Sequence, residues 1–193
     1  EGGRAARSLS TRLRAEHGWK TLADQRGLLI LHRGHDPVET LPHETGFVFG
    51  ERFGRVEPDP SPPCSECVDF IPGWITERWG AFVAIRIDRG FDIVRVLRDP
   101  SGAYPCYLSD FANVSVFFSS AEDFIALSPG VEPDLDSVRD FLRYPARQSR
   151  RTGLKGVDEL APGECAIYPR EGWSVEAYWT PHNFAKHSSP LDF

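Results

Sequence analysis

The sequence predicts an α+β fold built on antiparallel sheet. Alternating apolar runs joined by short turns fill the middle of the chain, and two short helical segments and a closing hairpin follow them. Strands that follow one another without intervening helices form antiparallel meanders rather than βαβ units. The length of 193 residues, with 40% hydrophobic side chains, is sufficient for one core and at most two small domains.

The first part of the chain is expected to hold one helix and two strands. Residues 4–16 repeat apolar side chains at helical spacing, and Gly18 ends the pattern. Residues 27–31 and 46–50 are apolar runs typical of buried strands. The composition of residues 54–69 then shifts to Pro, Asp, Glu and Ser, which predicts a surface loop.

The middle of the chain carries the strongest strand pattern, over residues 81–88, 91–97, 104–108 and 113–119. The two central runs flank the turn sequence Asp99-Pro100-Ser101-Gly102. Pro100 presets the backbone for an early turn position, and Gly102 tolerates the positive φ that short turns often need. We therefore expect a β-hairpin over residues 95–110, at the centre of an antiparallel meander.

Two helices and a hairpin are expected to complete the chain. Ser120 has the character of an N-cap for a short helix, and a second helix follows Pro133 and ends before Pro145. The apolar face of this second helix consists of Leu135, Val138, Phe141 and Leu142. Residues 163–168 and 174–179 form the final hairpin.

Charge and hydropathy exclude several classes of function. The chain has 28 acidic and 22 basic residues, and its net charge of −6 disfavours general binding to nucleic acid. No window is apolar enough to span a bilayer, and the N-terminal region lacks the apolar core of a signal peptide. We therefore expect a cytoplasmic protein. The sequence starts at Glu1 and contains no Met, so we expect it to be a piece of a longer protein.

The four cysteines give one candidate metal site. Cys64 and Cys67 have the spacing of half a zinc site or of a redox pair. They follow a proline-rich stretch, and no second close pair accompanies them. Cys106 and Cys165 lie in strand-like runs, where cysteine behaves as a small hydrophobic residue. We therefore predict no metal site and keep Cys64 with Cys67 as the alternative.

A cluster of basic residues lies near the end of the second of these helices. Its arginines are Arg139, Arg143, Arg147, Arg150 and Arg151. Cations near a helix C-terminus interact favourably with the helix dipole, which is the simpler interpretation. Within an acidic protein the same cluster is also the best candidate for a docking surface.

Several ordered motifs between residues 79 and 180 resemble the N-terminal class II glutamine amidotransferase domain of the asparagine synthetase family. That family combines a G-x-F-A-F strand, an R-D-x-x-G-x-x-P-L-Y segment, a strand ending in A/S-S-E and an L-P-P-G segment before the last hairpin. The matching residues here are Gly80, Arg98, Asp99, Gly102, Pro105, Tyr107, Ser120, Glu122, Pro162 and Gly163. The resemblance implies an Ntn-hydrolase-type αββα sandwich over residues 1–180, followed by a tail or linker at 181–193.

The residues that hydrolyse glutamine in that family have no counterparts here. The family uses an N-terminal cysteine as nucleophile, whereas this sequence starts at Glu1. The Asn-Gly pair of the family's oxyanion hole corresponds to Phe49 and Gly50. The motif that holds the glutamine ammonium group has no equivalent near residues 64–69. The resemblance thus implies a domain with no catalytic residues, as in β-lactam synthetases and the isopeptide-forming cyclases of lasso-peptide pathways, and GFVFGERFGR resembles the cyclases most.

We therefore expect a scaffold or substrate-docking domain of an ATP-dependent amide-bond-forming protein. The resemblance implies that ATP and Mg bind to a C-terminal synthetase domain, which is the expected partner, and that this chain needs no cofactor. A peptide substrate or leader peptide is a further expected partner, and a homodimer is left open. Two alternatives remain: an active glutaminase whose N-terminal cysteine precedes Glu1, and a free-standing peptide-binding module that uses a sheet edge or the arginine cluster.

Overall fold

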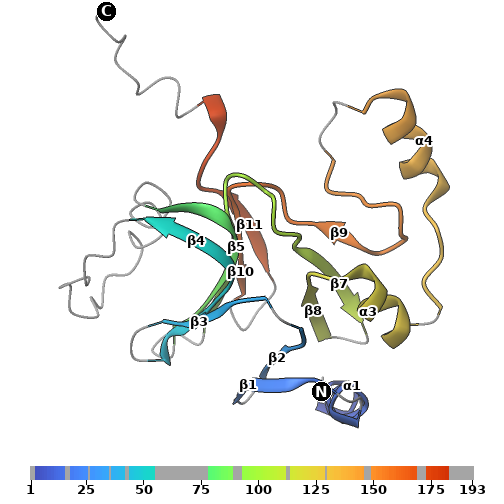
Figure 1. Cartoon of the computed structure of the whole chain (residues 1–193). Coiled ribbons are helices and arrows are strands. Elements are labelled where there is room, and N and C mark those ends of the chain that lie inside the picture. Colours follow the sequence, from blue (N-terminus) through green and yellow to red (C-terminus); the bar gives the residue numbers. More distant parts are fainter. Residues whose placement is uncertain are drawn as a thin grey trace, which may run out of the picture. The chain divides into compact units, whose positions relative to one another are not determined.

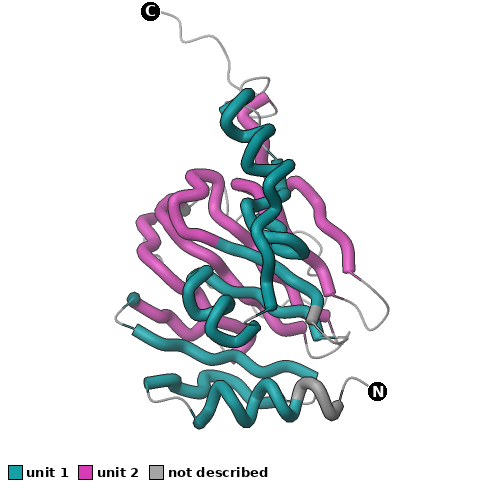
Figure 2. Tube along the Cα trace, turned by 90° about the vertical axis from the view of Figure 1, so that its right-hand side faces the viewer, with its two compact units in different colours: residues 1–36, 106–159 teal, residues 37–105, 160–193 magenta. Residues whose placement is uncertain are grey.

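The computed structural model describes residues 3–15, 18–25, 27–34, 36–41, 44–54, 78–88, 93–111, 114–128, 130–145, 149–168 and 173–182. Within these ranges the fold is α+β with antiparallel strands, as expected, and the strands form three sheets beside three helices (Figure 1). The chain divides into two compact units, each made of two separate segments (Figure 2). Unit 1 comprises Glu1–Asp36 and Cys106–Glu159, and unit 2 comprises Pro37–Pro105 and Leu160–Phe193.

Unit 2 is built on a six-stranded antiparallel sheet with the order β11-β10-β6-β5-β4-β3. Its strands are β3 (Val38–Thr40), β4 (Gly46–Gly54), β5 (Arg78–Asp88), β6 (Ile93–Arg98), β10 (Glu164–Tyr168) and β11 (Ser174–Ala177). The pairing of β10 with β11 confirms the predicted final hairpin.

The core of unit 2 is a row of side chains that lie in register across four strands. Val48 is opposite Ala84, Ala84 is opposite Leu97, and Leu97 is opposite Cys165. Directly opposed residues point to the same face of a sheet, so the four side chains pack together, and Phe82 joins them. The apolar runs of the sequence thus predict this core correctly.

Unit 1 combines small sheets with helices. Strand β1 (Lys20–Gln25) pairs with β2 (Leu28–His32), and a three-stranded sheet has the order β8-β7-β9. The strands of that sheet are β7 (Tyr107–Phe111), β8 (Val114–Phe118) and β9 (Asp158–Glu159). The helices are α1 (Gly3–Ala15), α3 (Ala121–Leu127) and α4 (Leu135–Arg143).

Helix α3 shows how local sequence determines an element of unit 1. The hydroxyl of Ser120 accepts a hydrogen bond from the Asp123 N–H at 3.2 Å, which confirms the predicted N-cap. Phe124 of the helix is buried and stacks on Phe118 of β8, with ring centroids 4.2 Å apart. The cap therefore begins the helix where its apolar side chain reaches the neighbouring strand.

The hairpin predicted over residues 95–110 is wrong. Strand β6 pairs with β5 and β10 in the six-stranded sheet, whereas β7 pairs with β8 and β9 in the three-stranded sheet. Residues 99–106 therefore connect two sheets rather than two neighbouring strands. Alternating apolar residues and a turn sequence predict strands and a reversal, but they do not determine which strand becomes the neighbour.

No helix of the described ranges is long and apolar enough to cross a membrane.

Candidate functional site

Two charged residues are buried where β6 ends in unit 2. Arg98 is 5% exposed and Asp99 is 0% exposed. A buried charge is costly unless hydrogen bonds or an opposite charge compensate it. The hydrogen-bond partners of these two side chains therefore show whether the pair is available for catalysis or stabilises the fold.

The guanidinium group of Arg98 donates to three backbone carbonyls. Nε donates to the carbonyl oxygen of Tyr104 at 2.9 Å. Nη1 donates to that of Leu160 at 2.6 Å, and Nη2 donates to that of Gly102 at 2.6 Å. The planar fork of an arginine suits several acceptors held at fixed directions. Arg98 thus joins the end of β6 to the turn after it and to the segment before β10.

The carboxylate of Asp99 accepts hydrogen bonds from backbone N–H groups. Oδ2 accepts from the Phe82 N–H at 3.1 Å, and Oδ1 accepts from the Ser101 N–H at 2.7 Å. The carbonyl oxygen of Asp99 also accepts from the N–H groups of Gly102 and Gly163. An aspartate that bonds to the N–H two residues later stabilises a turn. Both carboxylate oxygens therefore hold the backbone in place.

Glycine is required at two positions around this pair. Gly102 has a φ of +64°, and a Cβ on it would lie 2.5 Å from Cγ of Pro162. Gly163 has a φ of +74°, and a Cβ there would lie 2.6 Å from the carbonyl oxygen of Trp179. Both the positive φ and the lack of space exclude larger residues. The turn after β6 and the start of β10 thus approach each other closely.

Six of the motif residues predicted from the sequence come together at this place, which we call the Arg98–Asp99 node. Its members are Gly80, Arg98, Asp99, Gly102, Pro162 and Gly163. Gly80 belongs to it because its carbonyl oxygen accepts a hydrogen bond from the Ser101 hydroxyl at 2.8 Å. Sequence reasoning missed the acceptors Tyr104 and Leu160, since a backbone carbonyl has no side-chain signature.

The other motif residues lie elsewhere. Gly50 is in β4 of unit 2, where a Cβ would lie 2.3 Å from the carbonyl oxygen of Ala81. Pro105 is the last residue of the first segment of unit 2. Tyr107 of β7, the N-cap Ser120 and the exposed Glu122 of α3 belong to unit 1. These residues belong to strands, to a connection between strands and to a helix start.

The thiols in the described ranges are buried. Cys106 is 3% exposed and Cys165 is 0% exposed. Burial raises the pKa of the Cys165 thiol to about 12, so it carries almost no reactive thiolate at neutral pH. Cys64 and Cys67 lie outside the described residues. Among the residues that are described, no group of three or more His, Cys, Asp or Glu side chains forms a metal site.

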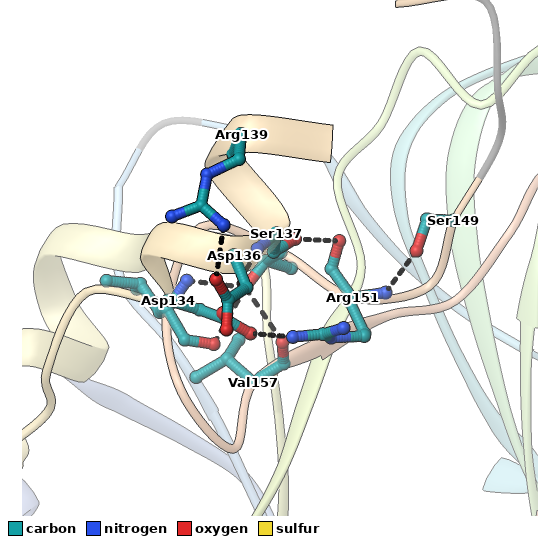
Figure 3. A network of polar contacts seen from close by, with 9 residues as sticks. Asp134, Asp136, Ser137, Arg139, Ser149, Arg151 and Val157 are labelled. Carbon is teal, nitrogen blue, oxygen red and sulfur yellow. Dashed lines mark hydrogen bonds and ion pairs between the residues drawn. The ribbon is translucent and has the colours of Figure 1, made fainter. Parts of the chain in front are cut away.

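Two arginines of the predicted cluster, Arg139 and Arg151, belong to a polar network in unit 1 (Figure 3). Nη2 of Arg151 donates to Oδ2 of Asp134 at 2.7 Å, and Asp134 also caps α4 by accepting from the Ser137 N–H at 3.1 Å. Nη1 of Arg139 donates to Asp136 at 3.0 Å. Two of the predicted docking arginines are therefore bonded to carboxylates of the same unit.

The remaining arginines of the cluster differ from these two. The side chain of Arg143 makes no hydrogen bond or ion pair with any other residue that the structure describes. The backbone carbonyl of Arg150 accepts from the Glu159 N–H at 2.7 Å. Arg147 lies outside the described residues. Arg143 is thus the arginine of α4 whose charge is available to another molecule.

No protein-family model matches this chain, and comparison with curated proteins finds no match.

Replacing Arg98 by alanine should lower the free energy of unfolding by about 3 kcal/mol, because it leaves one buried and two partly buried carbonyls without their donor. Arg98→Lys should recover only part of the lost stability, because one ammonium group cannot donate in the three directions in which the planar guanidinium donates. Urea unfolding followed by tryptophan fluorescence measures both. The exposed Arg139→Ala serves as control and should unfold like the wild type. Equal unfolding of Arg98→Ala and wild type would contradict a structural role.

Cys106 and Cys165 should be unreactive in the folded protein. In a Cys64→Ser/Cys67→Ser variant, a disulfide reagent such as DTNB should modify no thiol at pH 8 until denaturant is added, when both should react. Absorbance of the released thionitrobenzoate counts the modified thiols. Rapid modification of either thiol without denaturant would show that it is accessible.

The cap of α4 should titrate at unusually low pH. The hydrogen bond from Arg151 and that from the Ser137 N–H hold the pKa of Asp134 below its ordinary value of 3.8. The anchoring of α4 is therefore complete above that value and is lost as the pH falls through the lowered pKa. The amide shift of Ser137 in NMR spectra should report this midpoint, and Arg151→Gln should move it upward. Arg139→Gln, which leaves the Arg151–Asp134 pair intact, should move it much less.

Proposed function

We propose that this chain is a glutaminase-like domain of the Ntn-hydrolase type that no longer hydrolyses glutamine and acts as a scaffold in an ATP-dependent amide-bond-forming protein. The observation that carries the proposal is the Arg98–Asp99 node. Motifs that are distant in the sequence, at residues 80, 98–102 and 162–163, meet there in one hydrogen-bonded arrangement. A chance resemblance of separate motifs gives no reason for them to meet in space.

The sheets agree with this proposal. Unit 2 has a six-stranded antiparallel sheet, and unit 1 has a three-stranded antiparallel sheet together with helices. An αββα sandwich uses these two kinds of layer, with antiparallel sheets in the middle and helices outside. The sandwich itself is part of the proposal, as is the resemblance to lasso-peptide cyclases in the stretch that forms β4.

The loss of hydrolysis is supported by the residues at the position of the family's oxyanion hole. Phe49 pairs with Val83, and Gly50 pairs with Phe82, within the ladder of β4 and β5. Phe49 has no side-chain amide that could donate to a tetrahedral intermediate. Loss of one such donor costs roughly 3 kcal/mol of transition-state stabilisation. With both described thiols buried as well, we assign a structural role to the chain, and ATP with Mg to a synthetase domain of the intact protein.

The proposal is tested by measuring hydrolysis of glutamine. The chain starting at Glu1 should form no glutamate above the uncatalysed background, because it offers neither an N-terminal cysteine nor an oxyanion-hole amide. A version with one cysteine placed before Glu1, exposed by cleavage of a leader, should remain inactive because Phe49 is unchanged. Glutamate formation by the extended version would favour the active-glutaminase alternative. An S-G-G-x-D-S pyrophosphate loop encoded downstream is also expected, and its absence from the complete coding sequence would contradict the synthetase context.

A further inference from the structure

Helix α4 is attached to unit 1 without buried side chains of its own. Within the fully described helix Leu135–Arg143 no residue is buried, and Phe141 and Leu142 are 63% and 74% exposed. Val138 lies near Gly153, where a Cβ would be 3.4 Å from its Cγ2, and is still 38% exposed. Most helices of globular proteins are held by the packing of an apolar face. Such packing therefore contributes little to the attachment of α4.

Polar contacts fix the start of the helix instead. The Asp134 N–H donates to the carbonyl oxygen of Gly153 at 2.8 Å, and the Lys155 N–H donates to that of Glu132 at 2.9 Å. Two ion pairs join the same two segments. Arg151 bonds to the cap Asp134 at 2.7 Å (Figure 3), and Lys155 bonds to Glu132 at 2.8 Å. We call the four charged residues of these two pairs the α4 anchor.

Three of the four side chains of the α4 anchor are exposed to water. The exposed fraction is 56% for Arg151, 61% for Lys155 and 69% for Glu132. Exposed ion pairs contribute little to stability, and dissolved salt weakens them further. A helix of nine residues is also shorter than the roughly 12–15 residues that an isolated helix needs to be stable in water. The attached state of α4 is therefore held by weak contacts.

We propose that α4 is a two-state element, which opens and closes independently of the sheets of unit 1, and that the α4 anchor sets the equilibrium. In the closed state the anchor is formed and residues 135–143 are helical. In the open state both ion pairs are broken and the hydrogen bonds of the helix are lost, while the strands stay folded. A rise in ionic strength favours the open state, because opening breaks ion pairs that lie in water. This inference concerns unit 1 alone and is independent of the proposed scaffold role.

Helix α3 of the same unit provides an internal comparison, because it is shorter than α4 and yet has buried side chains. Its Phe124 and Leu127 are 4% and 8% exposed. The last hydrogen bonds of the two helices have the same length. The Ser128 N–H donates to the carbonyl oxygen of Phe124 at 2.9 Å, and the Tyr144 N–H donates to that of Asp140 at 2.9 Å. A difference in hydrogen exchange between these two amides therefore reports how the helices are anchored.

Native-state hydrogen exchange, measured for single amides of the whole chain by NMR, tests the proposal. After correction for intrinsic rates, the Tyr144 amide should exchange at least about tenfold faster than the Ser128 amide. Low concentrations of urea should leave exchange at Tyr144 unchanged, since local opening exposes little surface, but should accelerate exchange of the Leu108 amide in β7. Raising NaCl from about 0.05 M to about 0.5 M should accelerate exchange at Tyr144 severalfold.

Variants of the protein identify the anchor. Arg151→Gln combined with Lys155→Gln removes both ion pairs, so exchange at Tyr144 should become about threefold faster or more and should lose its dependence on salt. Exchange at Leu108 should keep its wild-type rate, which shows that the sheet remains folded. Arg14→Gln is the matched control, because it breaks an exposed ion pair with Asp24 elsewhere in unit 1 and should not affect Tyr144.

Three results would overturn the proposal. Equal protection of the Tyr144 and Ser128 amides would show that α4 is held as firmly as a helix with buried side chains. A urea dependence at Tyr144 as steep as that at Leu108 would show that α4 opens only when unit 1 unfolds. Unchanged exchange at Tyr144 in the variant without both ion pairs would show that the α4 anchor does not set the equilibrium. None of these measurements depends on glutamine hydrolysis.

Discussion

The buried guanidinium of Arg98 is the interaction on which the order of unit 2 depends. Through one side chain, the end of β6, the turn after it and the entry to β10 share a common donor. The carboxylate of Asp99 also accepts a hydrogen bond from the N–H of Phe82, in the middle of β5. Strands β5, β6 and β10 are thereby aligned at one edge by charge-assisted hydrogen bonds, and their apolar rows meet in register.

An adjacent arginine and aspartate at the end of a strand resemble catalytic residues in a sequence. Here their polar atoms are directed at backbone groups, which explains why both residues tolerate nearly complete burial. The same residues therefore stabilise the backbone of unit 2, and their polar atoms are not directed at a position where a substrate could bind. Helix α4 of unit 1 shows the opposite arrangement, because polar groups hold it in place and its apolar side chains are exposed.

Local patterns predicted most elements, and non-local partners were the main source of error. The helix at residues 4–16, the cap at Ser120 and the final hairpin are present because spacing and capping act within a few residues. Strands β1, β3 and β9 were missed since they are short or polar. The partner of β6 could not be predicted because strand β10, far along the chain, competes for the same edge. For the same reason the meeting of six of the motif residues at one node was not foreseen.

The division into two units, each assembled from two separated segments, has a consequence for folding. Unit 2 needs β10 and the carbonyl of Leu160 before Arg98 has its full set of acceptors. Such long-range pairing slows folding and leaves strand edges open until late. During synthesis one edge of β6 therefore stays open until β10 has been made. A product that ends at β9 retains the segments of unit 1 but leaves that edge of β6 unpaired, although β6 can still pair with β5. The order of the segments along the chain therefore makes aggregation of truncated products, rather than loss of a catalytic group, the expected result of incomplete synthesis.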